Sequence, residues 1–237
     1  MQIDIITIFA DMFKGVFSES MVKIAQQKGK FTINIHNLRD YTCDKHRRLD
    51  APPYGGGAGM VLQCEPLFKA VEAIIKSTEN RAQRTEKGKS KPKVIFLTPQ
   101  GRSFSQKKAK EMLEDEHLIL LCGHYEGIDQ RVRDSLVDEE ISVGDYILSG
   151  GEVAAMVIVD VLARLIPGVV GDYDSVENES FEDNLLDYPQ YTKPRDFRGK
   201  FVPSVLLSGD HKKIQEWRKE QALKRTRQRR PDLLKNI

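Results

Sequence analysis

Nine of the 17 glycines in this chain lie in three short segments, at 55–59, 123–127 and 144–151. Glycine lets a backbone adopt positive φ angles and approach a bound molecule closely. The second segment follows an apolar run of strand length, 118–122, and the third follows another stretch expected to be a strand, 140–143. Open α/β sheets bind ligands just beyond the carboxyl ends of such strands. Any one segment could be an ordinary tight turn, but the three together favour a cofactor site.

The glycines do not identify the cofactor by themselves. The GGGAGM run at 55–60 lacks the Lys-Ser/Thr pair of a phosphate-binding loop, which argues against a nucleotide-phosphate enzyme. No GxGxxG motif opens a helix after the first expected strand, which argues against an ordinary dinucleotide fold. The three cysteines, Cys43, Cys64 and Cys122, include no CxxC pair. They argue against a disulfide framework and a zinc site, and they fit a reducing cytosol.

A basic segment near the C-terminus could bind nucleic acid. Residues 211–230 contain nine Lys or Arg and two Glu, a local net charge of +7. Their pattern predicts one long helix, with Asp210 placed to cap it and Pro231 to end it. Trp217 and the arginines combine charge with groups that stack or hydrogen-bond, as RNA-binding faces do. The alternative is a solvated helix face, which is what most runs of charge are.

An acidic segment precedes this basic helix. Residues 172–187 contain seven Asp or Glu and no basic residue, so we expect a flexible linker there. The whole-chain net charge of +2 therefore combines +7 in the helix, −7 in the acidic segment and +2 elsewhere. A carboxylate beside a nucleobase can act as a general base. A linker that only improves solubility is the alternative interpretation.

Length and composition fit a globular protein. The chain has 237 residues, 40% of them hydrophobic and 30% charged, which suggests one large domain or two unequal ones. Its longest apolar stretch, 153–166, contains Asp160 and Arg164 and is too short and too charged to span a bilayer. The N-terminus has neither the basic region nor the cleavage site of a signal peptide. We expect a cytoplasmic protein without membrane contact.

Apolar periodicity predicts alternating strands and helices up to residue 170. This alternation is typical of an α/β domain with a parallel sheet covered by helices on both faces. The helix at 152–166 is apolar nearly all round, so we expect it in a core or against another subunit. A turn at 98–101 should end the third strand, and 77–93 should form an exposed loop. The expected strands are 2–8, 31–35, 94–97, 118–122, 140–143 and 146–148, and the expected helices are 11–27, 65–76, 105–113, 128–136 and 152–166.

Several motifs follow one another in the order seen in a known family. They are 53–60 (PYGGGAGM), 97–101 (LTPQG), 123–129 (GHYEGID), 142–152 (SVGDYILSGGE) and 229–234 (RRPDLL). On these motifs the chain resembles the bacterial tRNA (guanine-N1)-methyltransferases of the TrmD type. The resemblance extends from residue 1 to about residue 234.

The resemblance implies a fold and an activity. The fold would be a SPOUT-type α/β domain, whose parallel sheet contains a deep trefoil knot, followed by a small helical C-terminal domain. We expect a cofactor-binding domain at 1–170, a flexible acidic linker at 171–182 and a tRNA-binding domain at 183–237. The family forms homodimers with shared active sites. It transfers a methyl group from S-adenosylmethionine to N1 of guanine at tRNA position 37, when a guanine precedes that position. The resemblance also implies a requirement for magnesium, although the sequence shows no cluster of residues spaced to coordinate it.

Matching the family motifs position by position gives residues their expected roles. Glu179 matches the proposed general base, and Arg164 matches the arginine that assists it. The cofactor-binding positions match Leu97, Pro99, Gly123, Glu126, Gly127, Val143, Gly144, Asp145, Tyr146, Ile147, Leu148, Gly150 and Gly151. The residues expected to contact tRNA, from the resemblance and from the basic helix, are Asp50, Tyr54, Asp187, Arg218, Arg225, Arg227 and Arg229.

Three positions depart from the family pattern. Glu179 stands where the family has Asp, which keeps the chemistry but adds a methylene; Asp183 and Asp187 are the alternatives for the base. Gln190 replaces the usual His and cannot titrate. Ala154 replaces a Pro early in a helix, with little expected consequence because Ala is a good helix former.

Two other functions fit the same fold. A ribose 2′-O-methyltransferase would not need a base-directed carboxylate, so the acidic segment and the LSGGE run at 148–152 argue against it. A non-catalytic RNA-binding protein would not need all three glycine segments, which are intact here.

Overall fold

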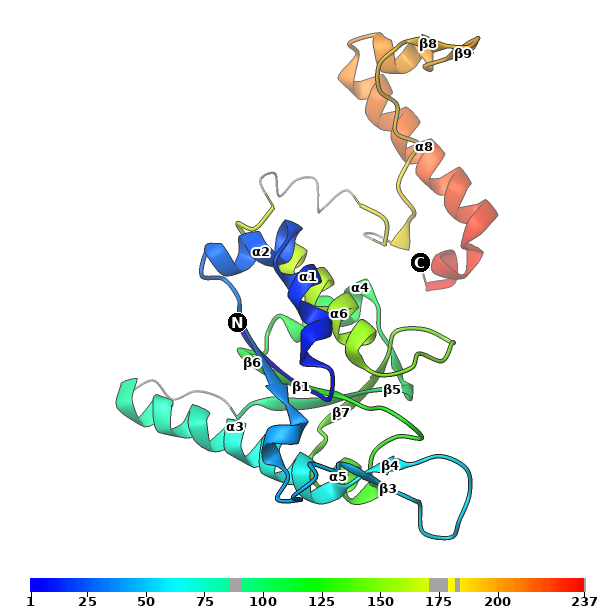
Figure 1. Cartoon of the computed structure of the whole chain (residues 1–237). Coiled ribbons are helices and arrows are strands. Elements are labelled where there is room, and N and C mark those ends of the chain that lie inside the picture. The colour runs from blue at the N-terminus through cyan, green and yellow to red at the C-terminus, as the bar shows by residue number, and fades with distance from the viewer. Residues whose placement is uncertain (86–90, 171–178, 182–183, 237) are drawn as a thin grey trace. The chain divides into compact units, whose positions relative to one another are not determined.

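The chain divides into two compact units, Met1–Gly171 and Asp172–Ile237 (Figure 1). The computed structural model describes residues 1–85, 91–170, 179–181 and 184–236. Most of the expected acidic linker, and with it Asp183, lies outside these described residues.

The first unit is built on a parallel sheet of five strands. The strands are β1 (Gln2–Thr7), β2 (Thr32–Asn37), β5 (Lys93–Ser103), β6 (His117–Cys122) and β7 (Glu139–Ser142). Their order is β2-β1-β6-β5-β7, and every neighbouring pair is parallel. This confirms the α/β class with a parallel sheet that the sequence predicts.

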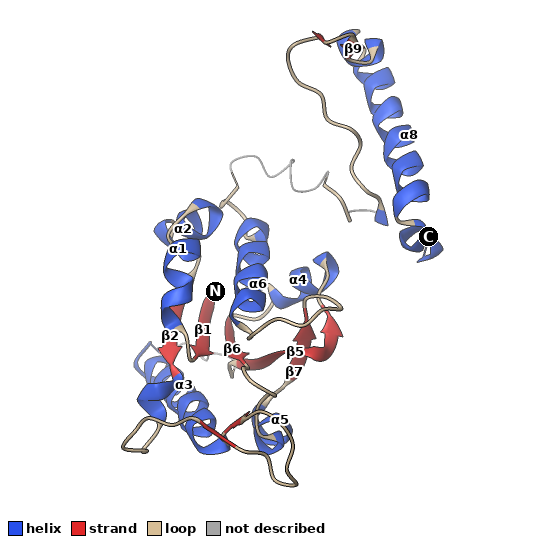
Figure 2. Cartoon of the chain, turned by 45° about the vertical axis from the view of Figure 1, so that its right-hand side comes forward, coloured by secondary structure: helices blue, strands red, loops and turns tan. Residues whose placement is uncertain are grey.

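Helices cover both faces of the sheet (Figure 2). Every residue of the central strand β6 is therefore buried, which is why its sequence HLILLC is almost wholly apolar. One face packs against α3 (Cys64–Thr85) and α5 (Gln130–Leu136). The helices on the other face are α1 (Phe13–Phe17), α2 (Ser20–Gln27), α4 (Gln106–Met112) and α6 (Glu152–Leu165).

Two helix predictions need correction. The single helix expected at 11–27 is a 3-10 turn, η1 (Ala10–Met12), followed by α1 and α2, and Ser20 has a φ of 52°. A positive φ cannot continue a right-handed helix, so the chain turns there. Conversely, α3 runs nine residues past the predicted end at 76. The residues after 76 are polar because most of that helix surface faces solvent.

The third strand also differs from the prediction. Strand β5 does not end at 97, because Leu97 and Arg102 both pair with Ile141 and residues 98–101 form an insertion between them. Gly101 makes this second pairing possible, since a Cβ there would collide with the backbone of Glu140 and Ile141. Residues 146–148, expected as a strand, form part of an irregular loop.

Short elements complete the first unit. The strands β3 (Asp50–Ala51) and β4 (Val61–Leu62) form an antiparallel pair whose connecting loop contains the PYGGGAGM run. The 3-10 helix η2 (Leu38–Tyr41) follows β2. Leu38, Leu49 and Leu62 bury their side chains in the core beneath α3, which holds this region against the sheet.

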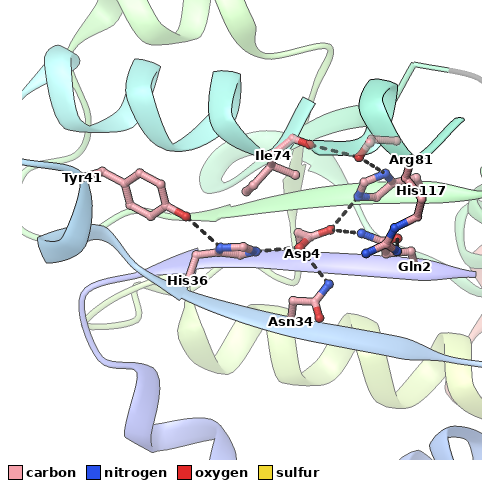
Figure 3. A network of polar contacts seen from close by, with 9 residues as sticks. Gln2, Asp4, Asn34, His36, Tyr41, Ile74, Arg81 and His117 are labelled. Carbon is pink, nitrogen blue, oxygen red and sulfur yellow. Dashed lines mark hydrogen bonds and ion pairs between the residues drawn. The ribbon is translucent and has the colours of Figure 1, made fainter. Parts of the chain in front are cut away.

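A polar cluster lies on the sheet face beneath α3 (Figure 3). The buried carboxylate of Asp4 accepts hydrogen bonds from His36 Nε2 and His117 Nε2, each at 2.6 Å. It also accepts from Gln2 Nε2 at 2.7 Å and from Asn34 Nδ2 at 3.0 Å. Burial raises the pKa of this carboxyl, but the hydrogen bonds outweigh burial and hold the pKa well below its usual range.

The same cluster ties five elements of the first unit together, namely β1, β2, η2, β6 and α3. The second ring nitrogen of His36 lies 2.9 Å from the hydroxyl of Tyr41. The second ring nitrogen of His117 lies 3.3 Å from Oγ1 of Thr78, which also donates to the carbonyl of Ile74 in α3. Asp4 on β1 therefore connects β2 with β6, and His117 extends the connection to the helix above them.

The second unit combines one long helix with an extended segment. Helix α8 (His211–Arg229) is capped by Asp210, whose carboxylate accepts from the amide of Lys213 at 3.2 Å, which confirms the predicted cap. The hairpin β8 (Asp196–Phe197) and β9 (Lys200–Phe201) and the 3-10 helix η4 (Ser204–Leu207) precede it, and η5 (Pro231–Asn236) follows. The expected helical domain is therefore only partly helical.

Candidate active site

A cavity of about 260 Å³ lies at the carboxyl edge of the sheet. The insertion within β5 and the loops after β6 and β7 meet there, as expected for a ligand site in an open parallel sheet. They contribute residues 97–100, 123–127 and 143–151, with Asp145 excepted, and the lining also includes Phe96, Ile141, Ser142 and Ala154.

The cavity gathers nearly all of the residues expected to bind a cofactor. Twelve of those thirteen residues line it, and Asp145 does not. Sequence reasoning missed several neighbours of the predicted residues, although each lies on or beside one of the same three loops. A search for polar side chains adjacent to the loop glycines would have found part of this set. The missed residues are Phe96, Thr98, Gln100, His124, Tyr125, Ile141, Ser142, Ser149 and Ala154.

Close contacts between the β6 and β7 loops require glycine. The Gly151 amide donates to the Gly123 carbonyl at 2.9 Å, and His124 pairs with Gly150 in an antiparallel bridge. A Cβ on Gly151 would lie 2.7 Å from Cα of Cys122, and a Cβ on Gly150 would lie 2.7 Å from Nδ1 of His124. Side chains at these two glycines would push the loops apart.

The β7 loop is folded by its own polar groups. Oγ of Ser142 donates to the carbonyl of Gly144 at 3.1 Å and accepts from its amide at 3.3 Å. The Tyr146 hydroxyl donates to the carbonyl of Val143 at 3.2 Å, and its ring fills the space that a Cβ on Gly144 would occupy. These bonds leave Tyr146 and Ile147 exposed at the mouth of the cavity.

His124 presents an unsatisfied polar atom at the cavity. Its Nδ1 is buried and has no hydrogen-bond partner within the described part of the chain. The ring packs edge-on against Phe9 and Tyr125, with centroid distances of 5.1 and 4.7 Å. Buried polar nitrogens in folded proteins almost always have a partner. His124 Nδ1 is therefore suited to a hydrogen bond with a bound molecule.

Glu152 and Cys122 are buried residues next to the cavity loops, and neither lines the cavity. The buried carboxylate of Glu152 accepts from the hydroxyl of Thr7 at 2.7 Å. Burial, and then the nearby charge of Glu152, raises the pKa of the Cys122 thiol well above its usual value. This cysteine is therefore an inert core residue, not a nucleophile.

The loop that resembles the family's guanine-side loop lies beside the β6 loop. The amide of Glu126 donates to the carbonyl of Met60 at 3.0 Å, and a Cβ on Gly59 would meet the Glu126 side chain. Asp50 lies in β3 and is half-buried, whereas Tyr54 is fully exposed at the tip of the loop. Neither residue lines the cavity.

The residues expected to catalyse the reaction lie in different units. Arg164 is in the last turn of α6 and is half-buried. Glu179 belongs to the second unit and is also half-buried. Neither lines the cavity at the sheet edge, so their joint action stays a prediction.

The residues of the second unit that were expected to contact tRNA lie on and beside α8. The carbonyl of Asp187 accepts from Nη1 of Arg225 at 3.2 Å, which joins two of them. Arg227 and Arg229 are exposed near the end of the helix. Arg218 lies further towards its start, with its guanidinium carbon 4.7 Å from the ring centroid of Tyr188.

Metal and membrane sites were also sought. Among the described residues, no group of three or more His, Cys, Asp or Glu side chains could hold a metal ion. No helix in the described ranges is both long and apolar enough to cross a membrane.

Comparison with known proteins assigns nearly the whole chain to one family. The model of a family described as tRNA (Guanine-1)-methyltransferase TrmD matches residues 1–236. The chain belongs to this family. A TrmD relative from Carboxydothermus hydrogenoformans, named tRNA (guanine-N(1)-)-methyltransferase, is 58% identical over 99% of this chain and 88% of its own length. Relatives of the same name from Bacillus cereus and Bacillus anthracis are 54% identical over 99% of this chain and 92% of theirs. The cavity thus lies on three of the motifs that carry the TrmD resemblance, at 97–101, 123–129 and 142–152.

Proposed function

We propose that this chain transfers a methyl group from S-adenosylmethionine to N1 of guanine at tRNA position 37, when a guanine precedes it. Full-length membership of the TrmD family supports methylation of guanine in tRNA. The observation that carries the proposal is the cavity at the sheet edge, which is built from the family's glycine motifs. Position 37 and the preceding guanine follow from the family resemblance.

The cavity suits S-adenosylmethionine chemically. Gly150 and Gly151 let the loops that line the cavity pack closely together, and the buried Nδ1 of His124 offers a hydrogen bond. Tyr146 and Leu148 would supply backbone groups to the adenine. When bound, the cofactor supplies an electrophilic methyl group carried on a sulfonium. The surrounding loops would orient that group and exclude water from it.

Proton removal is the step that needs a protein group. Guanine N1 carries a proton and is a poor nucleophile until a base takes that proton. Glu179 would accept the proton, while Arg164 would stabilise the negative charge that develops on O6. The turn that carries Glu179 is anchored, because the amide of Asp187 donates to Oγ of Ser180 at 3.0 Å.

The second unit would bind the tRNA. Its helix α8 carries lysines and arginines in large excess and buries only Ala222 and Thr226, so most of its cationic surface is available. Positive charge of this kind binds phosphates and makes affinity fall as salt concentration rises. A tRNA substrate is consistent with the expected cytoplasmic location.

A homodimer of knotted, SPOUT-type subunits completes the proposal. Helix α6 is buried on one side, but Val153 and Val157 are exposed on the other. Met12 and Val16 are also exposed on the neighbouring η1 and α1, which contributes further apolar surface. Exposed apolar surface of this kind is typical of subunit interfaces. A second copy of the chain would cover it, in line with the expectation that this helix packs against another subunit.

The test is methyl transfer to unmodified tRNA transcripts that carry guanine or adenine at position 36. The wild-type chain should methylate guanine N1 at position 37 only in the first transcript. Glu179→Gln should lower the transfer rate by ~100-fold or more, the scale expected for loss of a general base, without weakening cofactor binding by calorimetry. Glu179→Asp is the matched control and should retain most of the activity. Methylation of a ribose, or a Gln variant within a few-fold of wild type, would contradict the proposal.

A further inference from the structure

The second unit contains its own cavity, of about 430 Å³. It lies where the extended segment 188–195 runs alongside the first half of α8 and η4. All of its lining residues belong to the second unit, so it is distinct from the cofactor cavity of the sheet.

The lining of this cavity combines apolar, aromatic and cationic groups. Leu206 and Ile214 supply apolar surface, and Tyr188 and Tyr191 supply rings. Lys193, Arg195 and Arg218 supply positive charge, and the described lining includes no carboxylate. A cavity of this composition suits a flat, anionic ligand.

Arg218 is the most informative residue of the lining. Its guanidinium carbon lies over the ring of Tyr188, at 4.7 Å from the centroid, which is the distance of a cation–π contact. Its Nε is buried and has no hydrogen-bond partner among the residues that the structure describes. An arginine nitrogen can only donate, so this atom needs an acceptor such as a phosphate or carbonyl oxygen.

The aromatic side of the cavity is open to a ligand. Tyr191 packs obliquely against Trp217 with a centroid distance of 6.4 Å, yet about half of its surface remains exposed. Gln190 donates through Nε2 to the carboxylate of Asp187 at 3.1 Å, which leaves its amide oxygen available as an acceptor. A ring and a fixed amide beside a cationic site match the two parts of a nucleotide.

We propose that this cavity binds one unstacked nucleotide of the RNA substrate. The base would stack on Tyr191, the amide oxygen of Gln190 would accept a hydrogen bond from the base edge, and a phosphate oxygen would accept from Nε of Arg218. Proteins read single-stranded RNA by this combination of aromatic stacking and arginine contacts. The inference rests on the proposed function, since it requires that the second unit binds tRNA.

The test is a scan of the tRNA with single abasic nucleotides, measured with three proteins. In wild type, one abasic position should weaken binding by ~5- to 100-fold, the range expected for a lost stacking contact. In Tyr191→Leu and in Arg218→Lys, binding to intact tRNA should weaken and the same abasic position should add little further loss. Lys219→Gln is the matched control, because Lys219 is exposed beside Arg218 and outside the cavity. It should lower affinity equally at all positions.

Trp217 provides a second readout because it is the only tryptophan and contacts Tyr191. Its fluorescence should change when wild type binds tRNA, and the change should be lost in the cavity variants. The inference would be overturned if, at every abasic position, the loss of tRNA affinity added fully to the loss caused by the cavity variant. It would also be overturned if nucleoside 5′-monophosphates changed the fluorescence while no abasic position weakened binding. If wild type methylates tRNA normally while the losses are additive, only this inference fails. If wild type does not bind tRNA at all, the proposed function fails as well.

Discussion

Replacement of Asp4 by asparagine should destabilise the first unit substantially. The substitution changes little in shape but removes the charge that accepts four hydrogen bonds (Figure 3). An asparagine oxygen can keep two of them, and its amide group then faces two other donors. His117 is the critical one, because it is buried and cannot turn to water.

The size of the effect follows from the four hydrogen bonds. A hydrogen bond to a charged group is worth about 1.5–3 kcal/mol, so losing two of them costs roughly 3–6 kcal/mol. Rotation of the Gln2 or Asn34 amide recovers part of this, which leaves a net loss of about 3 kcal/mol. With a urea slope of about 2 kcal/mol per molar, the unfolding midpoint should fall by ~1.5 M.

The pH dependence has a defined sign. Because the hydrogen bonds hold the pKa of Asp4 below its unfolded value, its stabilisation is fully present above the ordinary Asp pKa of about 3.9. It is lost as the pH falls further, towards the lowered pKa of the folded state. The difference in unfolding free energy between wild type and Asp4→Asn should therefore shrink as the pH falls below about pH 4.

The assay is urea unfolding followed by far-UV circular dichroism, since the only tryptophan lies in the second unit. Asp11→Asn is the matched control, because Asp11 is a carboxylate of the same unit whose side chain is 86% exposed. That variant should unfold at the wild-type midpoint. A loss below about 1 kcal/mol for Asp4→Asn, or a loss that does not change in acid, would refute the reasoning.

Other variants test the remaining contacts. Gly101→Ala should lower the free energy of unfolding in urea by roughly 2–4 kcal/mol and weaken cofactor binding in calorimetry. The added Cβ would collide with the backbone of Ile141 and separate β5 from β7. An unchanged free energy of unfolding would contradict this. Cys122 should resist thiol reagents until the chain unfolds, since burial raises its pKa, and rapid labelling of all three cysteines would refute that assignment. Thr226→Val should lower the stability of the second unit by about 1–2 kcal/mol, measured by Trp217 fluorescence in urea, because the amide of Leu186 loses its acceptor at 2.8 Å; an unchanged midpoint would argue against that contact.

Local sequence patterns predicted much of this fold. Four of the five strands of the large sheet are confirmed within two residues, because buried parallel strands are recognisable as apolar runs between turn signals. Helix α8 and its cap at Asp210 are confirmed because capping depends on neighbouring residues alone. The glycine loops were also recognisable, since glycine next to a buried strand indicates a close approach of the backbone.

Features that depend on distant residues could not be predicted in this way. Strand β5 continues past residue 97 only because β7 offers Ile141 as a partner twice. The helix continues past Lys76, and its residue Thr78 contacts His117, which lies far away in the sequence. His124 was not predicted as a cofactor-binding residue, because nothing nearby in the sequence shows that its Nδ1 is buried without a hydrogen-bond partner among the described residues.

The sequence by itself therefore determined the class of the fold, the position of the glycine loops and the family to which they point. Only the tertiary structure decided that twelve of the thirteen expected cofactor residues share one cavity, while Asp145 does not. It alone placed Arg218 over Tyr188 with a buried nitrogen in need of an acceptor. The physical reason is the same in both cases: a hydrogen bond or a cavity depends on atoms that are close in space, and chain folding brings such atoms together from residues far apart in the sequence.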